Sequence, residues 1–127
     1  MWIVDPRVGL LSVVVAGDSA TGEHSTDSVV IRARSRRHLR LLQDRCPSLA
    51  GAEIVRSGPE RDYACRMTVP RSAWVAAMSV LAETLDAKNV KSSAHRYEAA
   101  LGRDFVSAMH TVHATLARVK DAPPAAR

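Results

Sequence analysis

The sequence is poor in aromatic residues and in cysteine. Phe, Trp and Tyr make up 4% of its 127 residues, so the core must be filled mainly by Val, Leu, Ala and Met. Its two cysteines, Cys46 and Cys65, are too few for a disulfide framework. Both fall on faces that the pattern predicts to be buried. We therefore expect reduced core thiols, with a Cys46–Cys65 disulfide as the alternative.

A long hydrophobic run is also missing. The apolar stretch from Val8 to Ala16 is too short to span a bilayer. Asp5 and Arg7 precede it, where a signal peptide would have a basic start. These features predict a cytoplasmic protein without membrane contact.

Recognisable catalytic motifs are absent as well. The sequence has no Gly-x-Ser-x-Gly elbow, and the segment from Gly17 to Gly22 lacks the Lys-Ser/Thr that completes a phosphate-binding loop. His110 and His113 have a spacing that suits a metal, but no third ligand is apparent, and boundary histidines explain them equally well. His24 and His38 have the pattern of surface residues. We therefore predict a protein that is not an enzyme and has no cofactor or metal.

Positive charge is concentrated in one place, the basic segment Val29–Arg45. It holds six of the 18 basic residues and one of the 13 acids, Asp44, which leaves 12 of each elsewhere. The net charge of +5 therefore belongs to this segment alone. A local excess of arginine matters more for binding than the overall charge does.

Hydrophobic periodicity predicts an α+β domain over residues 1–120 and a disordered tail over 121–127. We expect two ββα units that form a mostly antiparallel four-stranded sheet with helices on one face, followed by C-terminal helices. The strands are predicted at Leu10–Ala16, Val29–Arg34, Ala52–Arg56 and Tyr63–Val69, with a solvated connection at Gly17–Asp27. The helices are predicted at Arg36–Cys46, Ala73–Leu85, Ser93–Leu101 and Arg103–Val119, with Ser35, Ser72 and Ser93 as N-caps and Gly102 as a C-terminal stop.

The same patterns predict which faces are buried. One face of the second strand carries Val29, Ile31 and Ala33, and the other carries Val30, Arg32 and Arg34. The apolar sets predicted on the remaining elements are Leu39, Leu42 and Cys46; Tyr63, Cys65, Met67 and Val69; Trp74, Met78, Leu81 and Leu85; and Phe105, Met109, Val112, Leu116 and Val119.

The arginines that leave these faces form the candidate binding surface. Arg32 and Arg34 project from a strand, and Arg36, Arg37 and Arg40 project from the helix that follows it. Guanidinium groups suit phosphates and carboxylates alike, so the surface could bind nucleic acid or an acidic protein face. The alternative is a solvated face whose arginine stems cover the sheet. Lys88 and Lys91, in a polar stretch before a helix, are further candidates for anion contact.

Several short motifs resemble a group of small bacterial proteins that are often encoded on plasmids or in phage-derived regions. They are the Met1-Trp2 start, the strand ending Val-Ile-Arg-Ala-Arg34, Asp62-Tyr63-x-x-Arg66, and Leu85-Asp-Ala-Lys-Asn-Val-Lys91. The sequence departs from the group at Val112-His113, where a Val-Trp pair is typical. The resemblance implies a mobile-element context, in which an anti-CRISPR or other host-takeover role is an expectation.

Together these features predict a binding module that engages nucleic acid or a nucleoprotein complex through arginine. The alternative is a protein–protein module, most simply a homodimer formed by pairing of the first apolar strand at a sheet edge.

Overall fold

The computed structural model describes residues 1–17, 20–58 and 61–119. The predicted tail at 121–127 lies outside this range. The strands are β1 (Trp2–Asp5), β2 (Gly9–Gly17), β3 (His24–Ala33), β4 (Val55–Arg56) and β5 (Cys65–Pro70). The helices are α1 (Arg36–Arg45), the 3-10 turn η1 (Pro47–Leu49), α2 (Arg71–Glu83), α3 (Val90–Arg96), α4 (Glu98–Leu101) and α5 (Arg103–Leu116).

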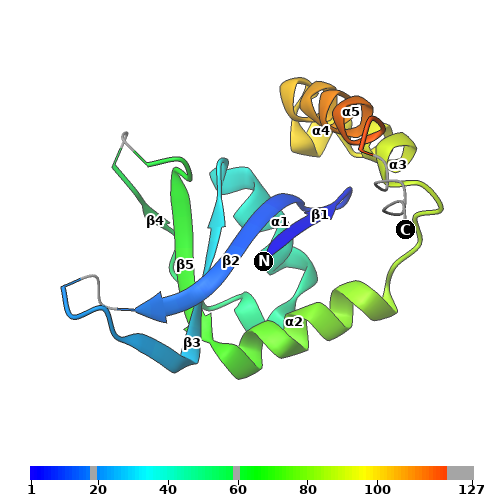
Figure 1. Ribbon diagram of the computed structural model, residues 1–127. Coiled ribbons are helices and arrows are strands. Elements are labelled where there is room, and N and C mark those ends of the chain that lie inside the picture. The colour runs from blue at the N-terminus through cyan, green and yellow to red at the C-terminus, as the bar shows by residue number, and fades with distance from the viewer. Residues whose placement is uncertain (18–19, 59–60, 120–127) are drawn as a thin grey trace, which may run out of the picture.

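The strands form one antiparallel sheet in the order β1-β2-β3-β5-β4 (Figure 1). The predicted α+β class is confirmed, but the sheet has five strands rather than four. Trp2–Asp5 forms a strand that the pattern did not reveal, so the first half of the chain is βββα and not ββα. The predicted strand Ala52–Arg56 shrinks to Val55–Arg56. The predicted Gly17–Asp27 connection is shorter than expected, because β3 already begins at His24, which pairs with Gly17.

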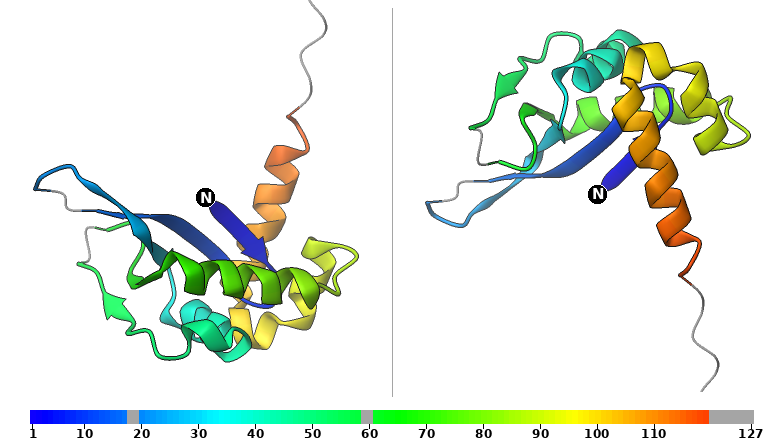
Figure 2. Two further views of the ribbon diagram at one scale, coloured as in Figure 1. Left: turned by 90° about the horizontal axis from the view of Figure 1, so that it is seen from below. Right: turned by 90° about the horizontal axis from the view of Figure 1, so that it is seen from above.

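One face of the sheet is covered by α1 and α2 (Figure 2). The predicted inward residues Val29, Ile31 and Ala33 are buried there against Leu39 and Leu42 of α1. Trp74 of α2 is 6% exposed within the same core, as its helical spacing predicted. Both cysteines are free and buried, and burial raises the pKa of Cys46, so the neutral thiol is favoured there.

Helix boundaries follow their capping groups. Ser35 is the N-cap of α1 as predicted, because its hydroxyl accepts the Arg37 N–H. The predicted Ser72 cap is wrong, since α2 begins directly after Pro70 without a side-chain cap bond. Ser93 is buried inside α3, and the cap of that helix is Asn89, whose side chain accepts the Ser92 N–H. Gly102 ends α4 with a φ of 98°, a conformation that favours glycine.

A buried charged cluster ties the β1–β2 turn to the end of α2. Arg7 is 2% exposed, and its Nε and Nη2 donate to the two Asp5 carboxylate oxygens at 3.0 and 2.7 Å. The same guanidinium donates to the carbonyl oxygens of Thr84 and Leu81 at 2.8 and 2.9 Å. Burial alone would raise the pKa of Asp5, but its hydrogen bonds from Arg7 and the Arg7 charge outweigh burial and lower it. Arg7 therefore closes one end of the core.

The C-terminal helices form a second cluster around Ala94, Leu101 and Val106. Helix α5 extends away from the sheet in both views of Figure 2. Its first half packs through Phe105 and Met109, but the predicted apolar side fails beyond them, because Val112, Leu116 and Val119 are exposed. Helical periodicity predicts which residues share one side of a helix. It does not predict how far along the helix the rest of the protein packs against that side. Among the described residues, no helix has both the length and the apolar character that a membrane crossing requires.

Candidate nucleic-acid interface

The basic segment folds as predicted into the end of β3, a capped turn and the first turns of α1. Arg34, Arg36, Arg37 and Arg40 are exposed, and Arg32 is half-buried. Because β3 passes directly into α1 at Ser35, arginines from a strand and from a helix lie within a few residues of one another along a rigid junction. Regular secondary structure therefore fixes the positions of these arginines along the backbone. This arrangement fits a binding surface, and it equally fits a solvated face whose arginine stems cover the sheet.

The strand register places a second arginine beside this segment. Trp2, Ser12, Arg32, Arg66 and Val55 lie directly opposite one another on successive strands. We call this set the outer row, since these side chains lie on the face away from the helices. Like charges directly opposite each other in a sheet are destabilising. The juxtaposition of Arg32 and Arg66 is thus costly unless an anion compensates it.

The two outer-row arginines use only part of their hydrogen-bonding capacity within the protein. Nη2 of Arg32 donates to the Ser12 hydroxyl at 2.7 Å, and Nε of Arg66 donates to the Ser57 hydroxyl at 2.8 Å. Nε of Arg32 is buried and has no hydrogen-bond partner within the described chain. An unpaired buried donor costs free energy. This atom is closed to solvent, so a ligand would contact Arg32 through the remaining N–H groups of its guanidinium.

Tyr63 connects the strand arginines. The guanidinium carbons of Arg32 and Arg34 lie 4.8 and 5.3 Å from its ring centroid. The prediction that Tyr63 shares the buried face of Cys65 is wrong, because Tyr63 precedes the ladder of β5, is only half-buried, and contacts arginines of the opposite face. Trp2, at the other end of the outer row, is 76% exposed. The surface therefore combines arginine with aromatic rings, which the linear sequence keeps far apart.

No acid among the described residues pairs with this surface. In the part of the chain that the structure describes, Arg7–Asp5 is the one ion pair, and it belongs to the core. No described carboxylate thus pairs with Arg32, Arg34, Arg36, Arg37, Arg40 or Arg66. Two arginines of α1 lean instead toward the C-terminal helices: Arg37 donates to the Ala100 carbonyl at 3.4 Å, and Arg45 lies 5.7 Å from the Tyr97 ring centroid.

Lys88 and Lys91 do not join the arginines through any contact between described residues. Lys88 is exposed and lines a shallow hollow of about 410 Å³ with Asp86, Asn89, Ser92, Ser93 and Arg96. Lys91 is half-buried on the first turn of α3. An aspartate in the same hollow offsets part of the charge. We therefore place the candidate interface on the arginines and leave the two lysines as a separate, weaker candidate.

The histidines differ most from their predicted positions. His38 is 4% exposed rather than on the surface, and its Nε2 lies 3.3 Å from the Leu101 carbonyl oxygen. Gly9 makes this possible, because a Cβ at that glycine would lie 2.5 Å from the His38 ring. Burial lowers the pKa of His38, and its Nδ1 has no partner among described groups. The imidazole is therefore a neutral packing group between α1 and α4.

The other histidine pair also differs from the predicted one. Nε2 of His110 lies 2.7 Å from Nε2 of His95 in α3, whereas His113 is exposed. Within the described ranges, no group of three or more His, Cys, Asp or Glu side chains is arranged to hold a metal ion. The pair joins two helices of the C-terminal cluster.

Comparison with protein-family models, with curated proteins and with solved structures gives no match to this chain. The candidate interface is consequently argued from its own geometry.

Proposed function

We propose that the protein is a non-enzymatic module that binds nucleic acid through the arginines at the β3–α1 junction and in the outer row. The observation that carries the proposal is the pairing of Arg32 with Arg66, two like charges directly opposite each other that no acid among the described residues compensates. Phosphate oxygens would accept hydrogen bonds from the remaining N–H groups of the two guanidiniums and remove the repulsion.

Single-stranded nucleic acid fits this surface better than a duplex does. Proteins that bind single strands combine a basic track with exposed aromatic rings on which bases stack. Trp2 and Tyr63 supply such rings on the same side of the sheet as Arg32 and Arg34. Arg36 and Arg40 are exposed on α1, which packs on the other face of the sheet, so a bound strand would reach them by passing around the β3–α1 junction.

The test is a titration of a labelled mixed-sequence single strand of about 20 nucleotides, and of the matching duplex, at several salt concentrations. We expect tighter binding of the single strand and an affinity that falls steeply as salt rises. The variant R36E/R40E changes two exposed side chains for which the structure records no contact. It should weaken binding by about tenfold or more and reduce the salt slope by about 1.4, the value for two lost phosphate contacts.

The matched control is R103E/R118E, which makes the same charge change on exposed residues of the C-terminal region. Equal loss in the two variants would mean that net charge, and not this surface, drives binding. Absence of binding at low salt would refute the proposal. The mobile-element origin and the host-takeover role belong to the same proposal, and capture from a native host with and without nuclease treatment tests them.

A further inference from the structure

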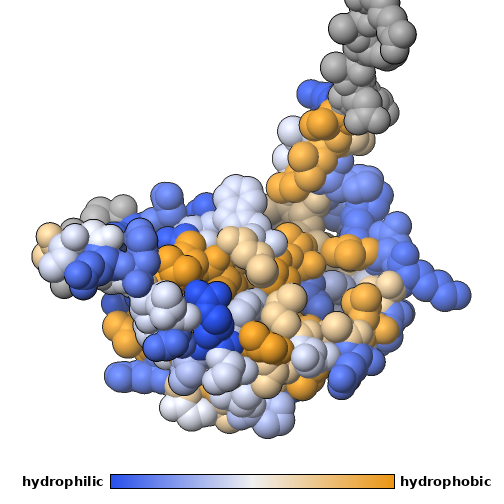
Figure 3. All heavy atoms as spheres, turned by 60° about the horizontal axis from the view of Figure 1, so that its bottom comes forward, coloured by the Kyte–Doolittle hydropathy of each residue, from blue (hydrophilic) through white to orange (hydrophobic). Residues whose placement is uncertain are grey.

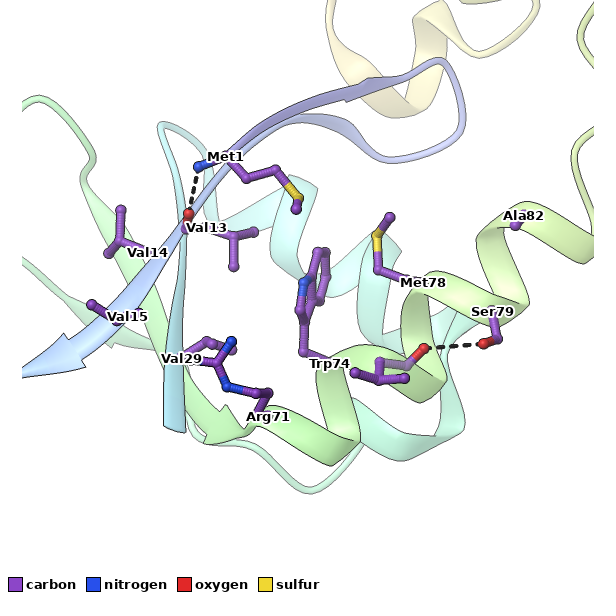
Figure 4. A pocket seen from close by; sticks show the side chains of 11 residues that line it. Met1, Val13, Val14, Val15, Val29, Arg71, Trp74, Met78, Ser79 and Ala82 are labelled. Atoms are coloured by element: carbon purple, nitrogen blue, oxygen red, sulfur yellow. Dashed lines mark hydrogen bonds between the residues drawn. The ribbon is translucent and has the colours of Figure 1, made fainter. Parts of the chain in front are cut away.

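A second surface lies on the opposite side of the sheet and has a different chemistry. A groove of about 580 Å³ runs between the outer edge of β2 and helix α2. Figure 4 shows Val13 and Val15 on one wall, and Trp74 and Met78 on the other. In Figure 3, where the α2 side comes forward, hydrophobic side chains are gathered across this part of the molecule. The groove is therefore an apolar surface distinct from the arginines.

One wall of the groove is a stretch of strand edge with which no other described strand pairs. The pairing of β1 with β2 ends where Met1 and Val13 exchange backbone hydrogen bonds of 2.8 Å. Backbone groups along an antiparallel strand point alternately to either side. The N–H and C=O of Val15 therefore point to the same side as those of Val13, beyond the end of β1, where no described strand lies. This edge offers a donor and an acceptor to an added strand.

The opposite wall would support the side chains of that strand. Val15 lies opposite Val29 in the register and shares its helix-facing side, yet it is 44% exposed. Val75 of α2, which also lines the groove, is 58% exposed. A strand added at Val15 would direct every second side chain into the groove and cover both valines.

Arg71 has the one charged side chain among the described residues that line the groove. Nε of Arg71 donates to the carbonyl oxygen of Thr26 at 2.8 Å. This bond holds the guanidinium near the end of β2, where Gly17 pairs with His24. The described residues that line the groove include no acid, and the remaining N–H groups of Arg71 are complementary to a carboxylate.

We propose that this groove binds an extended peptide segment of a partner protein, which adds as a strand to the edge of β2 at Val15. The peptide places alternate apolar side chains over α2 and an acidic side chain at the Arg71 end. The free backbone edge favours a peptide over a fatty acid, which could use the apolar walls and Arg71 but not the Val15 amide.

The experiment uses the full chain, tagged at its C-terminal end because Met1 lines the groove. The probes are blocked peptides of about seven residues in which valine alternates with threonine, ending in glutamate or, for comparison, in lysine. Binding is measured by fluorescence anisotropy and by amide chemical shifts. We expect the glutamate peptide to bind more tightly than the lysine peptide, with the largest shift at the Val15 amide.

Three variants locate the binding. Val15→Pro removes the edge donor without removing a ladder bond, because proline is tolerated where the N–H faces away from the sheet. Val75→Glu places a charge on the exposed wall and tests the same site through a helix, in case the proline variant is unstable. Each should lower affinity by about tenfold. Arg71→Gln should remove the preference for glutamate over lysine, and Val112→Glu, on exposed α5, is the control that should change nothing.

Failure of both peptides to bind, or an affinity of the Val15 and Val75 variants equal to that of the unchanged protein, would overturn the proposal. The proposal would also be overturned if oleate displaced the bound peptide and Val15→Pro left the affinity for oleate unchanged. That pair of results would identify a lipid site. A dimer in sedimentation analysis that Val15→Pro dissociates would assign the groove to a second copy. Peptide binding should survive in R36E/R40E, which keeps this result separate from nucleic-acid binding.

Discussion

The two sides of the sheet use buried arginine in opposite ways. On the side of α2, Arg7 donates to both oxygens of Asp5 and to two carbonyl oxygens. On the open side, Arg32 lies opposite another arginine, donates to one serine hydroxyl, and leaves its buried Nε unpaired. The first guanidinium is satisfied by the fold itself. The second retains capacity for a ligand.

This difference separates structural from functional charge. Charge that folding has already paired contributes to stability and leaves little for binding. Charge that stays unpaired lowers the stability slightly, and a ligand that pairs with it recovers that free energy on binding. The comparison predicts that substitutions on the two sides will differ in what they change, and three measurements test it.

Arg7→Met should have the largest effect on stability. It leaves the Asp5 carboxylate buried without its partner, and breaking a buried pair in this way costs about 3–5 kcal/mol. Urea unfolding measures the change. Arg32→Met is the matched control and should cost about 1 kcal/mol or less, because the side chain gives up one hydrogen bond to serine. Equal losses would erase the distinction between the two arginines.

His38 should give a smaller effect that depends on pH. Burial lowers the pKa of His38 from its ordinary 6.5, so below that pH the unfolded chain binds a proton that the folded chain does not. This contribution to stability is complete above pH 6.5 and is lost as the pH falls toward the folded-state pKa. The slope is at most about 1.4 kcal/mol per pH unit, the value for one proton.

The measurement is the free energy of unfolding between neutral pH and pH 5, compared with that of His38→Gln. The difference between the two curves isolates His38 from the remaining histidines. A parallel pair of curves would show that folding leaves the pKa of His38 unchanged, which its burial and unpartnered Nδ1 argue against.

Arg66→Gln should have the smallest effect on stability. Glutamine keeps a donor for Ser57 and removes the like charge opposite Arg32, so the free energy of unfolding should stay within about 0.5 kcal/mol. Affinity for the single-stranded probe should nevertheless fall. A stability loss comparable to that of Arg7→Met would show that Arg66 stabilises the fold, and it would argue against a role of Arg66 in the proposed interface.

Much of the covered side could be predicted from local pattern. The alternation of Val29, Ile31 and Ala33 and the helical spacing of Leu39 and Leu42 each identify a buried face correctly. The cap at Ser35 and the stop at Gly102 are equally local, since each depends on a side chain or a backbone angle of one residue.

The errors arise where a distant segment decides the outcome. Trp2–Asp5 is short and mixed in character, and it becomes a strand only because Gly9–Val13 lies beside it. His38 is buried because Gly9 leaves room for its ring and α4 offers a carbonyl. Asn89, rather than Ser93, caps α3, and both were plausible by residue type.

The candidate interface divides in the same way. The sequence by itself determined that the positive charge lies between Val29 and Arg45 and that its arginines leave the buried faces, because both follow from composition and periodicity. Only the tertiary structure decided that Arg66, Tyr63 and Trp2 join them, and that Lys88 and Lys91 do not. Strand register sets these neighbours, and it depends on contacts between segments far apart in the chain.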